Sequence, residues 1–243
     1  MPWGDPGLFC WHLARYHFAA PYAVGKRLLD VGCGEGYGSA LLAQCASQVV
    51  GVDYSPAAVM HAREAYLSDG VRNLRFEIAD ATALDPALGR FDVITCFEVI
   101  EHLENQDDAL SGLARALTAG GVMILSTPNS LVEHLFERIT NFKHPYHVGL
   151  LTPSDLRRSL RQHFRQIKLY GQSRRGAFLY TTLKALDVFN VRHRLVRSRQ
   201  MQVSLNRTIN RTSPAAFVKE DFQFNRWLIR QSPIVVAIAM SRD

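Results

Sequence analysis

The feature that most constrains the fold is an alternation of short apolar runs with amphipathic stretches between residues 27 and 170. This alternation is typical of βα units, in which consecutive strands form a mainly parallel sheet with helices packed against it. We therefore expect a doubly wound α/β fold. The expected strands are Arg27–Val31, Gln48–Val52, Leu74–Ile78, Phe91–Phe97, Val122–Ser126 and Phe164–Tyr170. The expected helices are His12–Tyr22, Tyr37–Ala46, Pro56–Ser68, Gln106–Leu117 and one beginning at Thr152-Pro153.

Length and composition suit one globular domain. The chain has 243 residues, 47% of them hydrophobic and 21% charged, which is enough to bury a substantial core. The sequence begins Met1-Pro2-Trp3-Gly4-Asp5, without a basic segment followed by an apolar run, and no stretch reaches the roughly 18 apolar residues of a spanning helix. Its four cysteines form no CxxC pair, which is typical of reduced thiols. We therefore expect a cytoplasmic protein.

The regular pattern stops after Gly171. Residues 176–191 favour a helix, residues 192–222 are basic and polar, and Ile234–Met240 reads as a last, buried strand. An addition of this size between two strands is expected to be functional or mobile, so we expect an insertion at 171–233. Its basic part carries six arginines between positions 192 and 211 and no acidic residue. Such a segment attracts nucleic acid, anionic lipid or a phosphorylated substrate, or is simply solvated.

A glycine-rich loop joins the first expected strand to a helix, in the run Leu28-Leu29-Asp30-Val31-Gly32-Cys33-Gly34-Glu35-Gly36. Glycines permit φ > 0 and let a ligand approach the main chain and the N-terminus of the next helix. Three acidic residues surround this loop in the fold, namely Asp30 before it, Asp53 at the end of the second strand and Asp80 after the third. Asp53 can accept both ribose hydroxyls and Asp80 an adenine amino group. The pattern indicates a nucleotide-like cofactor.

Residues 16–170 resemble the class I S-adenosylmethionine-dependent methyltransferases. The similar segments are the glycine loop, Val49-Val50-Gly51-Val52-Asp53, Phe91-Asp92-Val93-Ile94 and Leu113–Gly121. The resemblance implies a seven-stranded, mainly parallel sheet with the last strand antiparallel, and S-adenosylmethionine across the carboxyl ends of the strands. The cofactor-binding residues it implies are Asp30, Gly32, Gly34, Gly36, Asp53, Tyr54, Asp80, Ala81 and Phe97. A turn without a ligand and an NAD site are the alternatives.

The acceptor side is expected at Glu98-Val99-Ile100-Glu101-His102, which follows the fourth strand. In a helix, the two glutamates and the histidine would share one face. They suit either general-base catalysis, with His102, Glu98 and His147 as catalytic residues, or a divalent metal such as Mg²⁺. Similar residues, with a later histidine, hold a metal in some quinol and small-RNA methyltransferases, and here His144 or His147 offers that histidine. The metal set is then Glu98, Glu101, His102 and His147, and a purely structural role is the third option.

A bacterial subgroup with similar Arg15–Ala19, Gly34–Ser39, Phe97–His102 and Ser126–Asn129 segments implies O-methylation of a sugar or other small molecule in polysaccharide or secondary-metabolite biosynthesis. The alternatives are an RNA ribose 2′-O-methyltransferase, a quinol O-methyltransferase at a membrane surface, and a non-enzymatic binding protein. Nucleic acid is disfavoured because no RNA-binding module is recognisable. We divide the chain, 1–243, into a cap helix at 1–25, a cofactor core at 26–170, a lid over the acceptor site at 171–233 that could also pair with a second subunit in a homodimer, and the last strand at 234–243.

Overall fold

The computed structural model describes residues 6–67, 71–141, 144–174 and 222–242, and the chain divides into two compact units. The larger unit comprises residues 15–172 and 224–243, and the smaller comprises 1–14 and 173–223. In the smaller unit, the ring centroids of Trp11 and Phe222 are 4.7 Å apart, and the Gln223 amide donates a hydrogen bond to the Ser173 hydroxyl. The helix expected at 176–191 and the arginines of 192–211 lie outside the described residues, so the lid and the boundaries given to it stay predictions.

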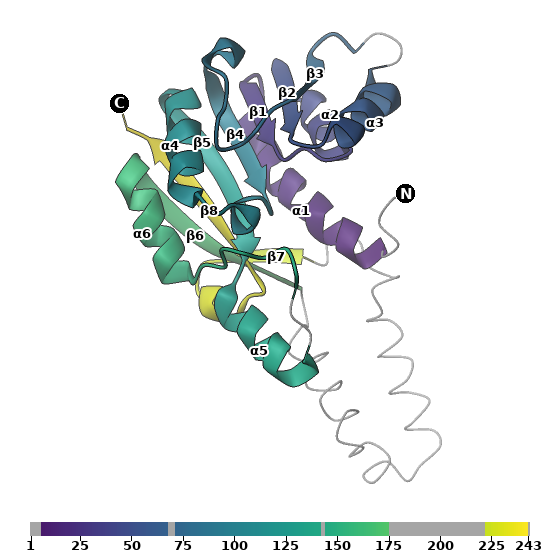
Figure 1. Ribbon diagram of the computed structural model, residues 1–243. Coiled ribbons are helices and arrows are strands. Elements are labelled where there is room, and N and C mark those ends of the chain that lie inside the picture. The colour runs from purple at the N-terminus through teal and green to yellow at the C-terminus, as the bar shows by residue number, and fades with distance from the viewer. Residues whose placement is uncertain (1–5, 68–70, 142–143, 175–221, 243) are drawn as a thin grey trace. The chain divides into compact units, whose positions relative to one another are not determined.

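The sheet has eight strands in the order β3-β2-β1-β4-β5-β8-β6-β7 (Figure 1). The strands are β1 Arg27–Val31, β2 Gln48–Asp53, β3 Leu74–Ile78, β4 Phe91–Phe97, β5 Leu117–Pro128, β6 Phe164–Arg174, β7 Phe222–Asn225 and β8 Ile234–Ser241. Strands β1 to β5 pair in parallel, whereas β8 is antiparallel to both β5 and β6. The predicted mainly parallel sheet with an antiparallel last strand is confirmed. The structure adds β7, a short edge strand inside the expected insertion.

Five helices follow the predicted order with shifted ends, and α5 is a helix that was not predicted from the sequence. The helices are α1 Pro6–Ala23, α2 Tyr37–Ala43, α3 Pro56–Tyr66, α4 Gln106–Ala116, α5 Ser130–Thr140 and α6 Pro153–His163. Side chains cap several N-termini, as at α3, where the Ser55 hydroxyl accepts from the backbone of Ala58 and Pro56 occupies the first turn. Strand β5 is longer than the predicted Val122–Ser126 because it pairs with β4 from Leu117 and with β8 as far as Pro128.

Both faces of the sheet are buried, which explains the continuous apolar runs of its strands. Neighbouring residues of one strand enter different cores because side chains alternate across a sheet. Leu28 belongs to the core shared with residues of α1, α2 and α3, and Leu29 to the core shared with α4 and α6. Figure 1 shows these two groups of helices on opposite sides of the sheet. Because β1 to β5 run in one direction, their carboxyl ends meet at one edge, where ligands bind in such folds.

Candidate functional site

A cavity of about 760 Å³ opens at the carboxyl ends of β1, β2, β3 and β4. Its wall combines the start of the glycine loop, the acidic ends of β2 and β3, and the turn after β4. The lining residues are Val31, Gly32, Asp53, Tyr54, Ala79, Asp80, Ala81, Thr82, Glu98, Val99, His102, Leu103 and Glu104. The structure thus brings seven of the cofactor and acceptor residues expected from the sequence, Tyr54 and Ala81 among them, to one space.

The glycine loop requires glycine for both backbone and steric reasons. Gly32, Gly34 and Gly36 have φ of 70°, 53° and 86°, a conformation that costs other residues free energy. At Gly32 a Cβ would collide with the side chain of Val99, which also lines the cavity. Gly36 is the N-cap of α2, so the positive end of that helix faces the loop. Such a loop leaves its backbone accessible to the charged end of a cofactor.

Short hydrogen bonds hold the two outer aspartates of the cofactor side, Asp53 and Asp80. Asp53 accepts from the backbone of Gly34 at 2.8 Å and of Ser55 at 2.9 Å, one through each carboxylate oxygen. Asp80 accepts from the backbone and the hydroxyl of Thr82, at 2.8 and 2.7 Å, both through Oδ1. Because each carboxylate oxygen has more than one lone pair, both residues keep acceptor capacity toward the cavity they line.

Asp30 and Phe97, also predicted to bind the cofactor, are not among the residues that line this cavity. Asp30 is fully buried beneath the loop, where the Ser39 and Thr95 hydroxyls donate to it at 2.6 and 2.7 Å, and Tyr16 lies at 3.3 Å. Burial raises the pKa of Asp30 to about 6, and these hydroxyls oppose the shift. Phe97 packs edge-on against Tyr16. Both residues contact α1 or the loop, so their effect on a cofactor would be indirect.

The turn after β4 differs from the helical arrangement considered above. Glu98 has a left-handed φ of 56°, and only Ile100–His102 form a short 3₁₀ helix. The prediction that both glutamates and the histidine share one helical face is therefore wrong. The left-handed backbone at Glu98 prevents a continuous helix through these residues. The Glu98 carboxylate accepts from the Ser126 hydroxyl at 2.8 Å, whereas Glu101 turns inward and is fully buried.

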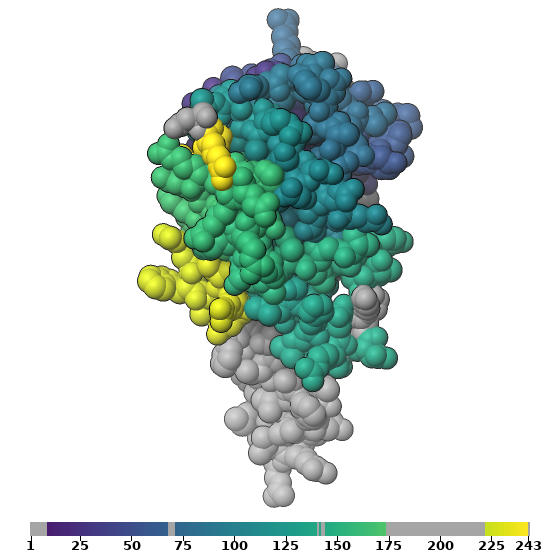
Figure 2. Space-filling model, turned by 60° about the vertical axis from the view of Figure 1, so that its left-hand side comes forward, coloured from purple at the N-terminus to yellow at the C-terminus, as the bar shows by residue number. Residues whose placement is uncertain are grey.

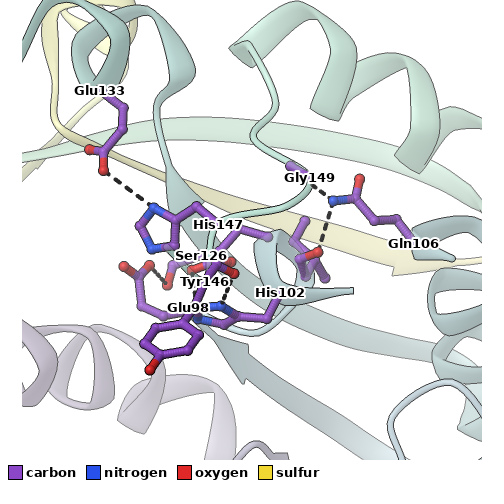
Figure 3. A network of polar contacts seen from close by, with 10 residues as sticks. Glu98, His102, Gln106, Ser126, Glu133, Tyr146, His147 and Gly149 are labelled. Carbon is purple, nitrogen blue, oxygen red and sulfur yellow. Dashed lines mark hydrogen bonds and ion pairs between the residues drawn. The ribbon is translucent and has the colours of Figure 1, made fainter. Parts of the chain in front are cut away.

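Three residues of this region nevertheless converge. Of the described residues, Glu101, His102 and His147 each offer one ligand atom, and these atoms lie within 4.8 Å of one another. We call these three residues the Glu101 cluster. Figure 3 shows Glu98 beside His102 and His147, with the imidazoles of these two histidines directed toward the same space. The stacked ring of His144 lies 3.8 Å from that of His147.

In both His102 and His147, a neighbouring oxygen atom lies close to one ring nitrogen, Nδ1, and so distinguishes it from Nε2. Nδ1 of His102 lies 2.8 Å from the Tyr146 carbonyl oxygen, which can only accept, so Nδ1 carries the proton and Nε2 is free. Nδ1 of His147 lies 3.3 Å from the Glu133 carboxylate of α5. The backbone carbonyl of Glu101 accepts from the amides of Val148 and Gly149, and this holds the histidine segment over the turn.

Electrostatics sets Glu101 apart within the described part of the chain. Neither carboxylate oxygen has a hydrogen-bond partner there, and the nearest basic atom recorded, Nε2 of His102, is 3.9 Å away. Burial, followed by repulsion from Glu98, holds the pKa of Glu101 well above its usual range, although the Thr127 hydroxyl and the charge of Arg15 oppose the rise. Burial, then the neighbouring His144, lowers the pKa of His147. A buried carboxyl group without a donor beside two imidazoles is an arrangement that a cation would satisfy.

Sequence reasoning missed the residues that hold this cluster in place. Glu133 of α5 and the carbonyl of Tyr146 orient the two histidines. The Gln106 amide donates to the carbonyls of Ile100 and Gly149, at 2.8 and 2.6 Å, and so joins the turn to the histidine segment. No spacing in the sequence points to these contacts, because they join segments that only the fold brings together.

Comparisons with known proteins agree with this geometry. A family model described as a methyltransferase domain matches residues 23–172. A probable S-adenosylmethionine-dependent methyltransferase of Mycolicibacterium smegmatis is 38% identical over 120 residues, covering 49% of this chain and 45% of that protein. A ubiquinone biosynthesis O-methyltransferase of Psychrobacter arcticus is 34% identical over 172 residues, covering 64% of this chain and 66% of that protein. The chain thus spans between about half and two thirds of these curated relatives.

Solved structures show the same fold. A possible histamine N-methyltransferase of Thermotoga maritima superposes with a TM-score of 0.64 at 14% identity, covering 98% of this chain and 92% of that one. A magnesium protoporphyrin IX methyltransferase of Synechocystis with bound S-adenosylhomocysteine has a TM-score of 0.55 at 24% identity, covering 69% and 76%.

In the described residues, no helix has the length and apolar character needed to cross a membrane. The matched domain covers more than half of the chain, and it includes the glycine loop, the acidic strand ends and the residues that line the cavity. The chain therefore belongs to the class I methyltransferases, enzymes that use S-adenosylmethionine as methyl donor.

Proposed function

We propose that this enzyme methylates a hydroxyl oxygen of a small molecule, which binds with that hydroxyl beside the Glu101 cluster. The observation that carries the proposal is the convergence of Glu101, His102 and His147 within 4.8 Å, with His102 lining the cofactor cavity. A hydroxyl is a weak nucleophile until its proton is removed, so an O-methyltransferase gains from a base at this position. Bound S-adenosylmethionine supplies the electrophilic methyl group.

His102 is suited to take that proton. Its Nδ1 is committed to the Tyr146 carbonyl, so the lone pair of Nε2 is available. About two fifths of the side chain is exposed, and the residue lines the cavity. We assign His102 as the general base and His147 as a second acceptor-side histidine, oriented by Glu133. Glu98, fixed by the Ser126 hydroxyl, would position the acceptor.

The same residues fit a divalent cation. Glu101 offers a buried carboxylate without a hydrogen-bond donor in the described residues, and both histidines have Nδ1 beside an oxygen, which leaves Nε2 for a ligand. A cation held by these three residues would lower the pKa of a hydroxyl bound to it. Two imidazoles and one carboxylate suit Mn²⁺, Fe²⁺ or Zn²⁺ better than the Mg²⁺ expected from the sequence, because Mg²⁺ prefers oxygen ligands.

The acceptor is a sugar or other small molecule in this proposal, and a quinol is the second candidate. The relatives named as ubiquinone biosynthesis O-methyltransferases favour the quinol, because the best covered of them matches 64% of this chain. Both acceptors present a hydroxyl, so the Glu101 cluster serves either. RNA ribose methylation requires a nucleic-acid surface, and the basic residues that suggested one lie outside the described residues.

Formation of S-adenosylhomocysteine from a panel of acceptors tests the proposal. The panel contains a sugar, a simple phenol, a soluble quinol and a short RNA, each with and without EDTA. His147→Ala should lower turnover on the active acceptor, while His134→Ala, an exposed histidine of α5, should not. Titration with Mn²⁺, Zn²⁺ and Mg²⁺ measures metal binding independently of activity. Methylation of only nitrogen or carbon acceptors, or equal turnover in the two variants, would contradict the proposal.

A further inference from the structure

A second cavity, of about 500 Å³, lies between α6, β6 and the 3₁₀ helix Ile229–Gln231. It shares no lining residue with the cofactor cavity. Four arginines line it, three from α6 and one from the 3₁₀ helix, and we call it the arginine pocket. Its lining residues are Pro153, Ser154, Arg157, Arg158, Arg161, Leu169, Ile229 and Arg230. Figure 2 shows the green surface of α6 and β6 bordering the yellow surface of residues 222–231.

The arginines of α6 are arranged as one stripe. Ser154, Arg157, Arg158 and Arg161 follow the spacing i, i+3, i+4, i+7, which places them on one face of the helix. Like charges three or four residues apart destabilise an isolated helix. Arg230 brings a fourth positive charge to the same cavity from a segment about 70 residues later in the sequence. The fold therefore concentrates positive charge at this cavity.

Little of this charge is balanced by the protein. Of the described residues, only Asp155 forms an ion pair with a pocket arginine, at 2.9 Å from Arg158. The other carboxylate oxygen of Asp155 accepts from the Thr152 hydroxyl at 2.6 Å. Arg157 donates a long hydrogen bond of 3.5 Å to the Ile167 carbonyl. Within the described part of the chain, the guanidinium groups of Arg161 and Arg230 have no hydrogen-bond or ion-pair partner.

The residues that line the arginine pocket restrict the class of ligand that can bind there. Guanidinium groups bind phosphate through paired N–H donors, and the first turn of α6, at Pro153 and Ser154, contributes the positive end of a helix of 11 residues. The apolar side chains of Leu169 and Ile229 line the remainder of the pocket. A concave site with a cationic rim and an apolar wall suits a soluble organic anion better than the flat surface of a bilayer.

We propose that the arginine pocket binds the phosphate or diphosphate group of a small organic ester, whose organic part contacts Leu169 and Ile229. The site is separate from the methyl-donor cavity, and it stands whether or not the acceptor proposed above is correct. The phosphate would lie between the α6 stripe and Arg230, where it would replace the missing counter-charge.

Calorimetric titration with inorganic diphosphate and with phenyl phosphate, at 150 mM salt and with saturating S-adenosylhomocysteine, tests the site. Saturating the donor cavity prevents the probes from binding there. The test variant is Arg157→Gln/Arg161→Gln/Arg230→Gln, and the matched control, Arg72→Gln/Arg90→Gln/Arg138→Gln, removes the same charge from exposed positions elsewhere. Loss of one charge-assisted hydrogen bond lowers affinity by roughly tenfold, so the triple test variant should lose binding of both probes.

Vesicles of phosphatidylcholine with and without phosphatidic acid distinguish a lipid headgroup from a soluble ester. The proposal is supported if both soluble probes bind the wild type and the control variant, and the test variant loses them while still binding S-adenosylhomocysteine. It is overturned if the soluble probes do not bind the wild type, if the test variant binds them as well as the control does, or if only the vesicles bind.

Discussion

Asp30 and Glu101 are both fully buried carboxyl groups near the same cavity, yet their surroundings are opposite. Asp30 receives hydrogen bonds from the Ser39 and Thr95 hydroxyls, with Tyr16 close by. Glu101 has no hydrogen-bond partner among the described residues and has Glu98 as a neighbouring negative charge. Burial raises the pKa of both groups; the hydroxyls around Asp30 oppose the rise, to about 6, whereas repulsion from Glu98 adds to the rise at Glu101.

This difference separates a carboxyl group held by hydrogen bonds from the one that we propose as a cation ligand. The cofactor side is complete without its ligand, because Asp30, Asp53 and Asp80 already accept hydrogen bonds that fix the loop and the strand ends. On the acceptor side, the ionised form of Glu101 is disfavoured, because burying an unpaired charge costs several kcal/mol in general. Changes on the cofactor side should therefore alter binding of the donor, and changes on the acceptor side should alter turnover or metal binding.

The largest expected effect is that of His102→Ala on turnover. Removal of a general base lowers rates by on the order of 10²–10⁴. The affinity for S-adenosylhomocysteine should change little, because the loop glycines and Asp53 remain. Steady-state kinetics on the active acceptor and calorimetry on the same preparations measure both quantities. Equal losses of turnover and of donor affinity would show that the two sides of the cavity are not separable in this way.

The second expected effect is a loss of donor affinity in Asp53→Ala. This change removes a carboxylate placed to accept two ribose hydroxyls and to hold the amides of Gly34 and Ser55. Loss of such charged hydrogen bonds costs about 1.5–3 kcal/mol, which is roughly 10- to 150-fold in affinity. Calorimetric titration with S-adenosylhomocysteine measures the change. Asp108→Ala, at an exposed position of α4, is the control, and unchanged binding in Asp53→Ala would remove this residue from the donor site.

Much of the cofactor side could be predicted from the sequence because its contacts are local. The glycine loop, Asp53 and Asp80 each stand at the end of a strand, and strand ends of a parallel sheet are placed by topology alone. Asp30 shows the limit of that reasoning. Its position in the motif was correct, but its direction, away from the cavity and toward Thr95 of β4, depends on side-chain packing across two strands.

The acceptor side could be predicted only in part, since its geometry depends on backbone exceptions and long-range contacts. The left-handed φ of Glu98 breaks the helical spacing from which the shared face was inferred. Glu133 reaches His147 from another element, and nothing in their sequence spacing predicts an interaction. Three residues of the predicted metal set, Glu101, His102 and His147, do converge, whereas Glu98 is not part of the cluster, and their binding of a metal stays a prediction.

The smallest expected effect is on stability, and it tests the contrast between the two buried carboxyl groups directly. Because the pKa of Glu101 in the folded chain lies above its value of 4.5 in the unfolded chain, the folded state binds more protons between those two values. The stability of the metal-free protein should therefore fall as the pH rises through this interval, by at most about 1.4 kcal/mol per pH unit. Glu101→Gln cannot ionise, so it should be more stable than the wild type at high pH.

Thermal unfolding of the metal-free proteins from pH 5 to pH 9 measures this difference, and about 1 kcal/mol would raise the melting temperature by roughly 2–4 °C. Asp30 also has a raised pKa, of about 6, so its titration lowers the stability of both proteins as the pH rises to that value. The difference in stability between the two proteins therefore reports Glu101 alone. Glu64→Gln, at an exposed position of α3, should follow the wild type. Added Mn²⁺ should stabilise the wild type at pH 8 and leave Glu101→Gln unchanged, because only the wild type offers a negative ligand. A wild type that is equally stable at both ends of the range, or a variant that responds equally to Mn²⁺, would show that Glu101 is paired in solution and that the two carboxyl groups do not differ.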